Sequence, residues 1–228
     1  MTTTTRAAAG AQTLARGIRV LREVAQARDG MTIQEVAERQ EIHRTIASRI
    51  LSTLAAEGLV HRNADGRYRG AAGLATLASA AHAALRSAAM EVLDEVAEQL
   101  DATATLLVEQ GDEAVALAVV TPSRPHYRIV FAEGSRHPLH LGAAGLALLC
   151  QRPEHPSDSP ELRQTRADGV ARTFAQVEPG MYGVAAPLGL ADPVACLNLI
   201  TNRPEHLDQA APILIDAAAR ITRNLEQG

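Results

Sequence analysis

The chain contains no tryptophan and no lysine, only two cysteines, and 2% aromatic residues among its 228 positions. Cys150 and Cys196 are isolated and lack the paired spacing of zinc ligands, so the sequence does not support a zinc ribbon or a disulfide framework. We expect both to be small buried side chains. With so few aromatic residues, the core must consist mainly of Ala, Leu, Val and Ile.

Long hydrophobic runs are also missing from the chain. No uncharged apolar run reaches about 18 residues, and the N-terminal stretch MTTTTRAAAGAQ lacks the hydrophobic region of a signal peptide. We therefore expect a cytoplasmic protein without a membrane span. Its length allows one large domain or two modest ones, each able to bury a core.

The net charge of -4 is unevenly distributed along the chain. Residues 1–70 hold 11 Arg against 7 acidic residues, whereas residues 71–228 hold 11 Arg against 19. This asymmetry favours a basic nucleic-acid reader joined to an acidic domain. The absence of lysine does not count against that reading, because Arg binds phosphates and base edges well.

The stretch from 31 to 58 predicts two short helices joined by a tight connection. The Thr32 hydroxyl can cap the first helix while Glu35 reaches back to the Thr32 backbone. In the second helix, one face carries small polar groups and an arginine, and the other is apolar. The polar face consists of Thr45, Ser48, Arg49 and Ser52, and the apolar face of Ala47, Ile50, Leu51 and Leu54. A helix that enters a DNA major groove needs such a polar face, although many ordinary amphipathic helices have one too.

A β-hairpin is predicted directly after these helices, from 59 to 70, with an Asp65-Gly66 turn. Its three arginines suit a wing that lies along phosphates, although a solvated charged hairpin would look the same. With a further helix over 10–28, residues 10–70 predict a winged helix-turn-helix domain. Its candidate DNA-binding residues are Thr32, Arg44, Thr45, Ser48 and Arg49 on the helices and Arg62, Arg67 and Arg69 on the wing.

Beyond the wing, the pattern predicts helices and then strands. Residues 71–86 form a linker helix with an apolar stripe of Leu74, Leu77, Ala78, Ala81 and Leu85, and a second helix spans 87–100. The stripe could be buried within the chain or in a dimer. Expected strands are 103–110, 114–121, 126–132, 181–188 and 194–201, with helices at 141–150 and 205–225 and a loop or short helix at 151–168. The chain is therefore of the α+β class, with a sensor-like domain over 87–228.

Five stretches in this order resemble the IclR family, the isocitrate lyase regulator family of transcription factors. They are TIQEVAERQEIHRTIASRILSTLAAEGLV, YRGAAGLATLA, GSRHPLHLGAAGLALL, GMYGVAAPL and ACLNLITNRPEH. The resemblance implies a winged helix-turn-helix, a linker helix and a GAF-like effector-binding domain. It also implies a dimer or dimer of dimers on a palindromic double-stranded DNA operator, and a small organic or aromatic acid as effector.

By this resemblance, eight residues of the second domain surround the effector: Ile129, His137, Ala143, Ala144, Met181, Gly183, Asn198 and Ile200. Strand alternation places 181 with 183 and 198 with 200 on one face, and the free N–H groups at a helix start suit a carboxylate. The apolar members would also serve as plain core residues.

Three positions depart from the family pattern. Leu146 replaces a usual Lys, His43 replaces a frequent Pro, and Gln176 occupies a position expected to be acidic. Altered effector chemistry, or an inactive pocket, would follow.

Catalysis and metal binding lack support in the sequence. His126, His137 and His140 lie on a predicted strand and loop without a carboxylate at ligand spacing, and no G-x-S-x-G motif occurs. We therefore predict no metal, no cofactor and no enzymatic activity. The function expected is a ligand-responsive transcription factor, with repression favoured over activation. The alternative is a sensor or protein-interaction module whose winged domain serves dimerisation rather than DNA binding.

Overall fold

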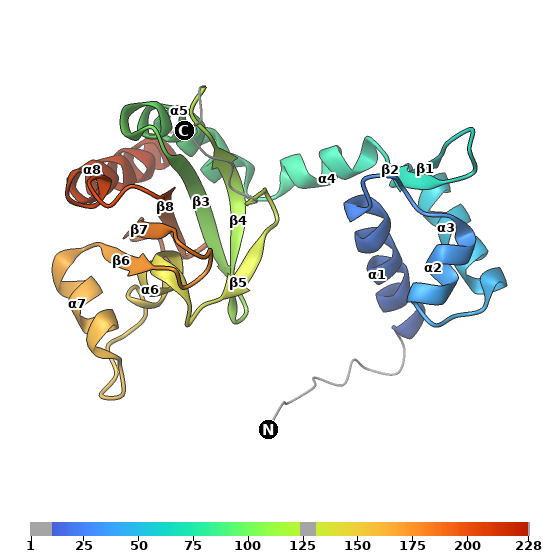
Figure 1. Ribbon diagram of the computed structural model, residues 1–228, viewed down its shortest axis with the longest axis horizontal. Coiled ribbons are helices and arrows are strands. Elements are labelled where there is room, and N and C mark those ends of the chain that lie inside the picture. The colour runs from blue at the N-terminus through green and yellow to red at the C-terminus, as the bar shows by residue number, and fades with distance from the viewer. Residues whose placement is uncertain (1–10, 124–130, 228) are drawn as a thin grey trace. The chain divides into compact units, whose positions relative to one another are not determined.

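The computed structural model describes residues 11–123 and 131–227, which divide between Ala81 and His82 into two compact units. The N-terminal unit holds three helices, a two-stranded hairpin and a short fourth helix, and the C-terminal unit is a sheet covered by helices (Figure 1). Within the described ranges, no helix is both long and apolar enough to cross a membrane.

The N-terminal unit is the predicted winged helix-turn-helix. Helices α1 (Gln12–Gln26), α2 (Ile33–Arg39) and α3 (Arg44–Ala56) precede the antiparallel strands β1 (Val60–Arg62) and β2 (Tyr68–Gly70). Met31 adds a bridge to Tyr68, so the wing is paired to the chain in front of α2. The core consists of Val20, Val24, Met31, Val36, Ala37, Ala47, Ile50, Leu51, Val60 and Tyr68.

The two helices after the wing differ from the sequence prediction in their boundary. Helix α4 spans Gly73–Ala80 and α5 spans Ala83–Leu100, and they are separated by His82 in the left-handed region (φ 48°). Leu85, predicted on the linker stripe, lies on α5 and is buried in the core of the C-terminal unit. The reason is that Leu85, Ala89 and Val92 share one apolar face of α5, so burial of that face extends the helix towards the N-terminus.

The C-terminal unit is built on one antiparallel sheet with strand order β5-β4-β3-β8-β7-β6. The strands are β3 (Thr103–Gln110), β4 (Glu113–Val120), β5 (Arg136–Pro138), β6 (Ala171–Phe174), β7 (Tyr182–Pro187) and β8 (Ala195–Thr201). The predicted strands at 103–110, 114–121, 181–188 and 194–201 are confirmed within one or two residues. Most of the predicted 126–132 strand lies outside the described residues, and β5 and β6 were not predicted.

Helices cover both faces of this sheet (Figure 1). Helices α5 and α8 (His206–Gln227) pack on one face, and α6 (Gly142–Leu149) packs on the other, next to α7 (Pro160–Asp168). Strand alternation separates the two environments: in β8, Leu197 and Leu199 face α5 and α8, whereas Cys196 and Asn198 face the α6 side. The α6 side therefore holds a separate set of side chains, independent of the larger core.

Candidate functional site

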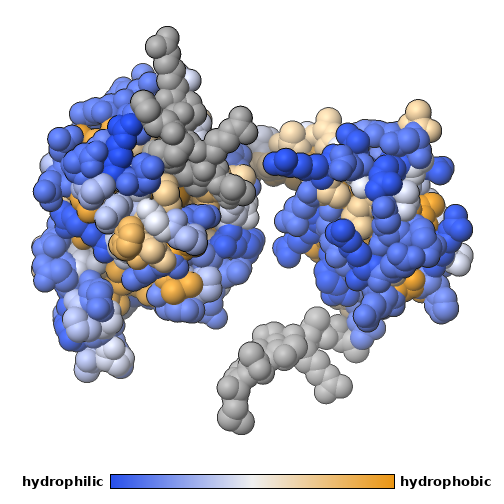
Figure 2. All heavy atoms as spheres, in the orientation of Figure 1, coloured by the Kyte–Doolittle hydropathy of each residue, from blue (hydrophilic) through white to orange (hydrophobic). Residues whose placement is uncertain are grey.

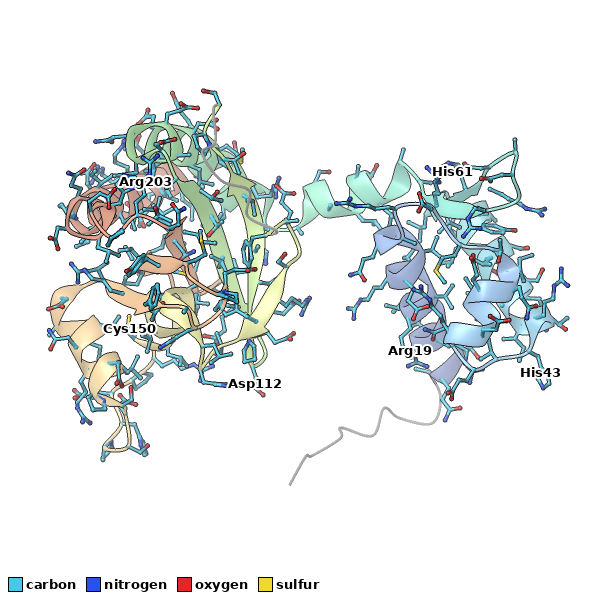
Figure 3. The ribbon with its side chains drawn as sticks, viewed as in Figure 1. Arg19, His43, His61, Asp112, Cys150 and Arg203 are labelled. Carbon is cyan, nitrogen blue, oxygen red and sulfur yellow. The ribbon has the colours of Figure 1, made fainter. Side chains whose placement is uncertain are left out.

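Helix α3 presents the polar face that the sequence predicted. Arg44, Thr45, Arg49 and Ser52 are exposed and Ser48 is half-buried, while Ala47, Ile50 and Leu51 form the packed face. His43 is the N-cap residue, is exposed, and makes no side-chain capping bond (Figure 3). Ile46 is also exposed on this helix, which the pattern of polar residues did not predict. The surface of this unit in Figure 2 is mainly hydrophilic, as a nucleic-acid interface requires.

The start of α2 is fixed by a capping box and by the wing. The Thr32 hydroxyl accepts from the Glu35 N–H at 3.2 Å, and the Thr32 N–H donates to the Glu35 carboxylate at 2.7 Å. Arg67 Nη2 donates to both oxygens of that carboxylate, at 2.7 and 2.9 Å. The Thr32 backbone N–H first, and then Arg67, hold the pKa of Glu35 below its usual range. The side chain of Thr32, a predicted DNA contact, is thus a helix cap in the free protein.

The wing arginines have unequal freedom to contact DNA. Arg67 also donates to the backbone carbonyls of Asp29 and Gly30, at 3.1 and 3.2 Å, so its guanidinium is engaged within the unit. Arg62 is exposed, donates to the Gly66 carbonyl at 3.3 Å, and lies 5.8 Å from the Tyr68 ring. Arg69 is half-buried, with one long bond to the Asp29 carbonyl at 3.4 Å. Of the three, Arg62 is the one most available to a phosphate.

A second candidate site is a small cavity of about 40 Å³ at the start of α6, which we call the α6 cavity. It lies between the helix start, strands β7 and β8, and the loop that joins β6 to β7. The cavity brings together seven of the eight residues that the sequence predicted: His137, Ala143, Ala144, Met181, Gly183, Asn198 and Ile200. The eighth, Ile129, lies outside the described residues. Lining residues that the prediction did not include are Phe131, Gly142, Thr173, Gln176, Val177, Glu178 and Tyr182.

His137 is the least satisfied polar group of this cavity. Its side chain is only 8% exposed, and neither ring nitrogen has a hydrogen-bond partner. Burial lowers the pKa of His137, so the imidazole is neutral near pH 7. The Phe131 ring lies 6.5 Å away. A buried imidazole without partners offers one donor and one acceptor to whatever enters the cavity.

Asn198 is held in place by a neighbouring strand. Its Nδ2 donates to the Thr105 hydroxyl at 3.1 Å, and that hydroxyl donates to the Asn198 carbonyl at 3.1 Å. Its Oδ1 lies 3.7 Å from the position that a Cβ on Gly183 would take. The missing side chain of Gly183 therefore leaves space in front of the amide oxygen. The sequence could not show Thr105 as the partner, because the two residues are 93 positions apart.

The N-terminus of α6 is capped by a side chain from the opposite wall. Gln176 Oε1 accepts from the Gly142 N–H at 2.8 Å, and the N-cap residue Leu141 contributes no side-chain bond. Ala143 and Ala144 follow in the first turn, where helix geometry provides no acceptor for their N–H groups. Their donors, added to the helix dipole, favour an anion at this point. The sequence identified Gln176 as a departure from the family pattern, but it did not predict that Gln176 caps the N-terminus of α6.

Two family models match the chain. The model described as "IclR helix-turn-helix domain" matches residues 13–64, and that described as "Bacterial transcriptional regulator IclR C-terminal" matches residues 77–160. The HTH-type transcriptional regulator Rv1719 of Mycobacterium tuberculosis is 31% identical over 202 residues, which covers 78% of this chain and 77% of the relative.

The chain belongs to the IclR family of transcriptional regulators.

Two further matches extend over most of the chain. The Pca regulon regulatory protein of Pseudomonas putida is 24% identical, covering 93% of this chain and 83% of the relative. An IclR homologue from Microbacterium hydrocarbonoxydans, solved as a complex with 4-hydroxybenzoate, has a TM-score of 0.81 and 22% identity, covering 95% of this chain and 100% of that one. The latter shows a shared fold. The IclR relatives matched are regulators, and the family is not one of enzymes.

Neither cysteine of this IclR chain is a candidate nucleophile. Both thiols are free, and burial raises the pKa of each, which keeps them protonated. Cys196 is a core residue, as predicted, and Cys150 is half-buried. In the ranges 11–123 and 131–227, no three His, Cys, Asp or Glu side chains are grouped as metal ligands would be.

Proposed function

We propose that this IclR-family regulator senses a small organic or aromatic acid in the α6 cavity and releases its operator when the acid binds. The observation that carries the proposal is the pairing of free N–H groups at the start of α6 with the buried, unpartnered His137. Both are polar groups left without protein partners in a cavity that also has apolar walls, and a few such polar groups are usual in a small-molecule site. The second candidate function, a module whose winged domain only dimerises, lacks a comparable observation.

The residues that line the cavity favour an acid of modest size. Among the described lining residues, the only formally charged side chain is Glu178, so an anion here would be bound by backbone N–H groups rather than by arginine. Ala143, Met181 and Ile200 supply apolar walls that suit a ring. The 4-hydroxybenzoate found with the Microbacterium hydrocarbonoxydans homologue is an acid of this class.

The DNA-reading face of α3 would act in a dimer, which presents two copies of it. Leu14 and Ile18 on α1 and Leu77 on α4 are exposed apolar residues, at 66%, 43% and 60% of their surface. We infer that a second copy covers these side chains in a dimer. A dimer, or a dimer of dimers, places two α3 helices on a palindromic operator, with Arg44, Thr45, Ser48 and Arg49 towards base edges.

Ligand-induced thermal stabilisation tests the effector class. At 100 times its dissociation constant, an acid that binds only the folded state stabilises it by about 2.7 kcal/mol, which raises Tm by several degrees. We expect this result with benzoate or 4-hydroxybenzoate, its loss in Asn198→Leu, and its retention in the exposed control Gln209→Ala. Equal Tm shifts in the wild type and Asn198→Leu would show that the acid binds outside the α6 cavity.

A mobility-shift titration tests the DNA half of the proposal. The wild type should bind selected palindromic DNA with an affinity that falls steeply as salt rises, and the acid should weaken that binding. Binding strengthened by the acid would mean activation through DNA retention, and no salt-sensitive binding to any selected sequence would favour the dimerisation module.

A further inference from the structure

The loop between β6 and β7, residues 175–181, lies over the start of α6 and is here called the strap. Its two ends are joined by a bond from the Ala175 N–H to the Met181 carbonyl at 2.8 Å. Four strap residues line the α6 cavity: Gln176, Val177, Glu178 and Met181. The strap therefore forms one wall of the cavity, whereas α6 and the sheet form the others.

Two strap side chains meet the same residue of α6. Gln176 Oε1 accepts from the Gly142 N–H, and Val177 Cγ2 lies 2.7 Å from the position of a Cβ on Gly142. Gly142 also has a φ of 76°, a conformation that a residue with a side chain rarely adopts. Glycine at 142 thus permits the strap to close on the helix start.

The amide oxygen of Gln176 occupies a position that suits the oxygen of a carboxylate. It accepts from the first N–H of α6, beside the donors of Ala143 and Ala144. His137 points to the same place, because its Nε2 lies 3.7 Å from the Cβ position of Gly142 and has no partner. The strap therefore supplies one acceptor oxygen to the N–H donors at the start of α6, and these donors can bind more than one acceptor.

We propose that Gln176 is an internal competitor of the effector: its amide oxygen holds the strap to Gly142 until a carboxylate takes its place. This inference rests on the proposed acid-binding function of the α6 cavity. Displacement of Gln176 removes the hydrogen bond that ties the strap to α6, so occupancy of the cavity is coupled to the position of residues 175–181.

The N–H donors at the start of α6 would select acids over neutral analogues. A hydrogen bond to a charged acceptor is roughly twice as strong as one to a neutral acceptor, so a carboxylate can displace the Gln176 amide. A ligand amide has the same acceptor type as Gln176 and gains nothing by exchange. Gln176 thereby lowers the apparent affinity of acids and of neutral analogues by one common factor, and the preference for acids comes from the N–H donors of the helix start.

Calorimetric titration with benzoate, acetate and benzamide tests the competition, using the full chain. Removing the competitor in Gln176→Ala should tighten benzoate and acetate binding about three- to tenfold, the population effect of losing one net hydrogen bond. Benzamide binding should gain by the same factor as benzoate binding, because the closed strap lowers the competent population equally for every ligand that displaces it. Gln176→Glu places a carboxylate on the same strap and should weaken both acids several-fold, and Gln209→Ala should match the wild type.

Hydrogen exchange of the Gly142 amide in ligand-free protein measures the Gln176–Gly142 hydrogen bond independently of ligand binding. The exchange rate should rise in Gln176→Ala by a factor similar to the gain in acid affinity, and should be unchanged in Gln209→Ala. Weaker acid binding in Gln176→Ala would make Gln176 a ligand contact and overturn the competition. Acid binding that is equal in all four proteins would also overturn it and would leave the proposed function standing. If neither acid binds any of the four proteins, both ideas fail, whatever the exchange rate of Gly142.

Discussion

The guanidinium of Arg67, on the wing, lies 2.7 Å from the carboxylate of Glu35, in the first turn of α2. The same side chain donates to the carbonyls of Asp29 and Gly30, directly before the Met31–Tyr68 bridge. Arg67 therefore ties three segments of the reader together: the wing, the chain between α1 and α2, and the capping box. The sequence predicted that Arg67 binds phosphate, whereas in the structure its partners lie within the unit and position the wing.

Replacing Arg67 by Ala should loosen the wing. We expect faster hydrogen exchange at the paired N–H groups of Met31 and Tyr68, a lower Tm than in the exposed control Arg19→Ala, and similar losses of affinity for all DNA sequences. Arg67→Lys should not restore the wild type, because an ammonium cannot reproduce the guanidinium geometry. Unchanged exchange, together with a salt slope reduced by about one phosphate contact, would instead make Arg67 a DNA ligand.

Arg49 and Arg62 should differ in what their loss does to DNA binding. Arg49 lies on the exposed face of α3, and Arg49→Ala should cost about 1–3 kcal/mol of discrimination between operator and scrambled DNA. Arg62→Ala should weaken binding to both DNAs equally and lower the salt slope by about one. Fluorescence-anisotropy titrations at several salt concentrations measure both quantities. Equal losses on both DNAs for Arg49→Ala would reassign it to a phosphate.

Local patterns were enough to predict the reader and most of the sheet. Helical spacing separated the two faces of α3, and the Thr32–Glu35 spacing predicted a capping box that the structure contains. Strand alternation likewise placed Met181 with Gly183, and Asn198 with Ile200, on one face of their strands. In each case, the deciding contacts lie within a few residues or follow from a fixed repeat.

Contacts between distant segments were not predictable in the same way. The partner of Gln176 is 34 residues away and that of Asn198 is 93 residues away, so neither bond leaves a local signal. Strand β6 was missed because its four residues alternate only weakly, and it is stabilised by pairing with β7. The helix break at His82 was missed because the apolar repeat continues across it.

The buried His137 predicts a pH dependence of stability. Since burial lowers its pKa in the folded state, the unfolded chain takes up a proton first, at about pH 6.5. The free energy of unfolding should be undiminished above that pH and should fall as the pH decreases from 6.5 towards the lowered pKa. Urea unfolding at pH 7.5 and 5.5 should show a smaller loss in His137→Phe than in the wild type, and the exposed control His140→Gln should behave as the wild type. A loss as large in His137→Phe would assign the pH dependence to other groups.

Two glycines in helices should respond to alanine in opposite ways. A Cβ on Gly145 would lie 2.1 Å from the Leu139 carbonyl oxygen, a backbone atom, so Gly145→Ala must displace α6 from the segment that follows β5. We expect a loss of about 1–3 kcal/mol, the usual cost of overpacking. No atom lies within 4 Å of a Cβ on Gly17 in α1, so Gly17→Ala should stabilise the reader by about 0.5–1 kcal/mol. Denaturant midpoints report both, and a stable Gly145→Ala variant would show that the α6 start adjusts readily.

The alternation of β8 has a consequence for how this regulator can diverge. Leu197 and Leu199 are committed to the core shared with α5 and α8, whereas Asn198 and Ile200 line the α6 cavity. A library that varies only 198 and 200 explores new ligands without disturbing the helix pair on the other face. In a saturation scan, tolerance along this strand should therefore rise and fall with a period of two, and gains of new inducers should come from alternate positions.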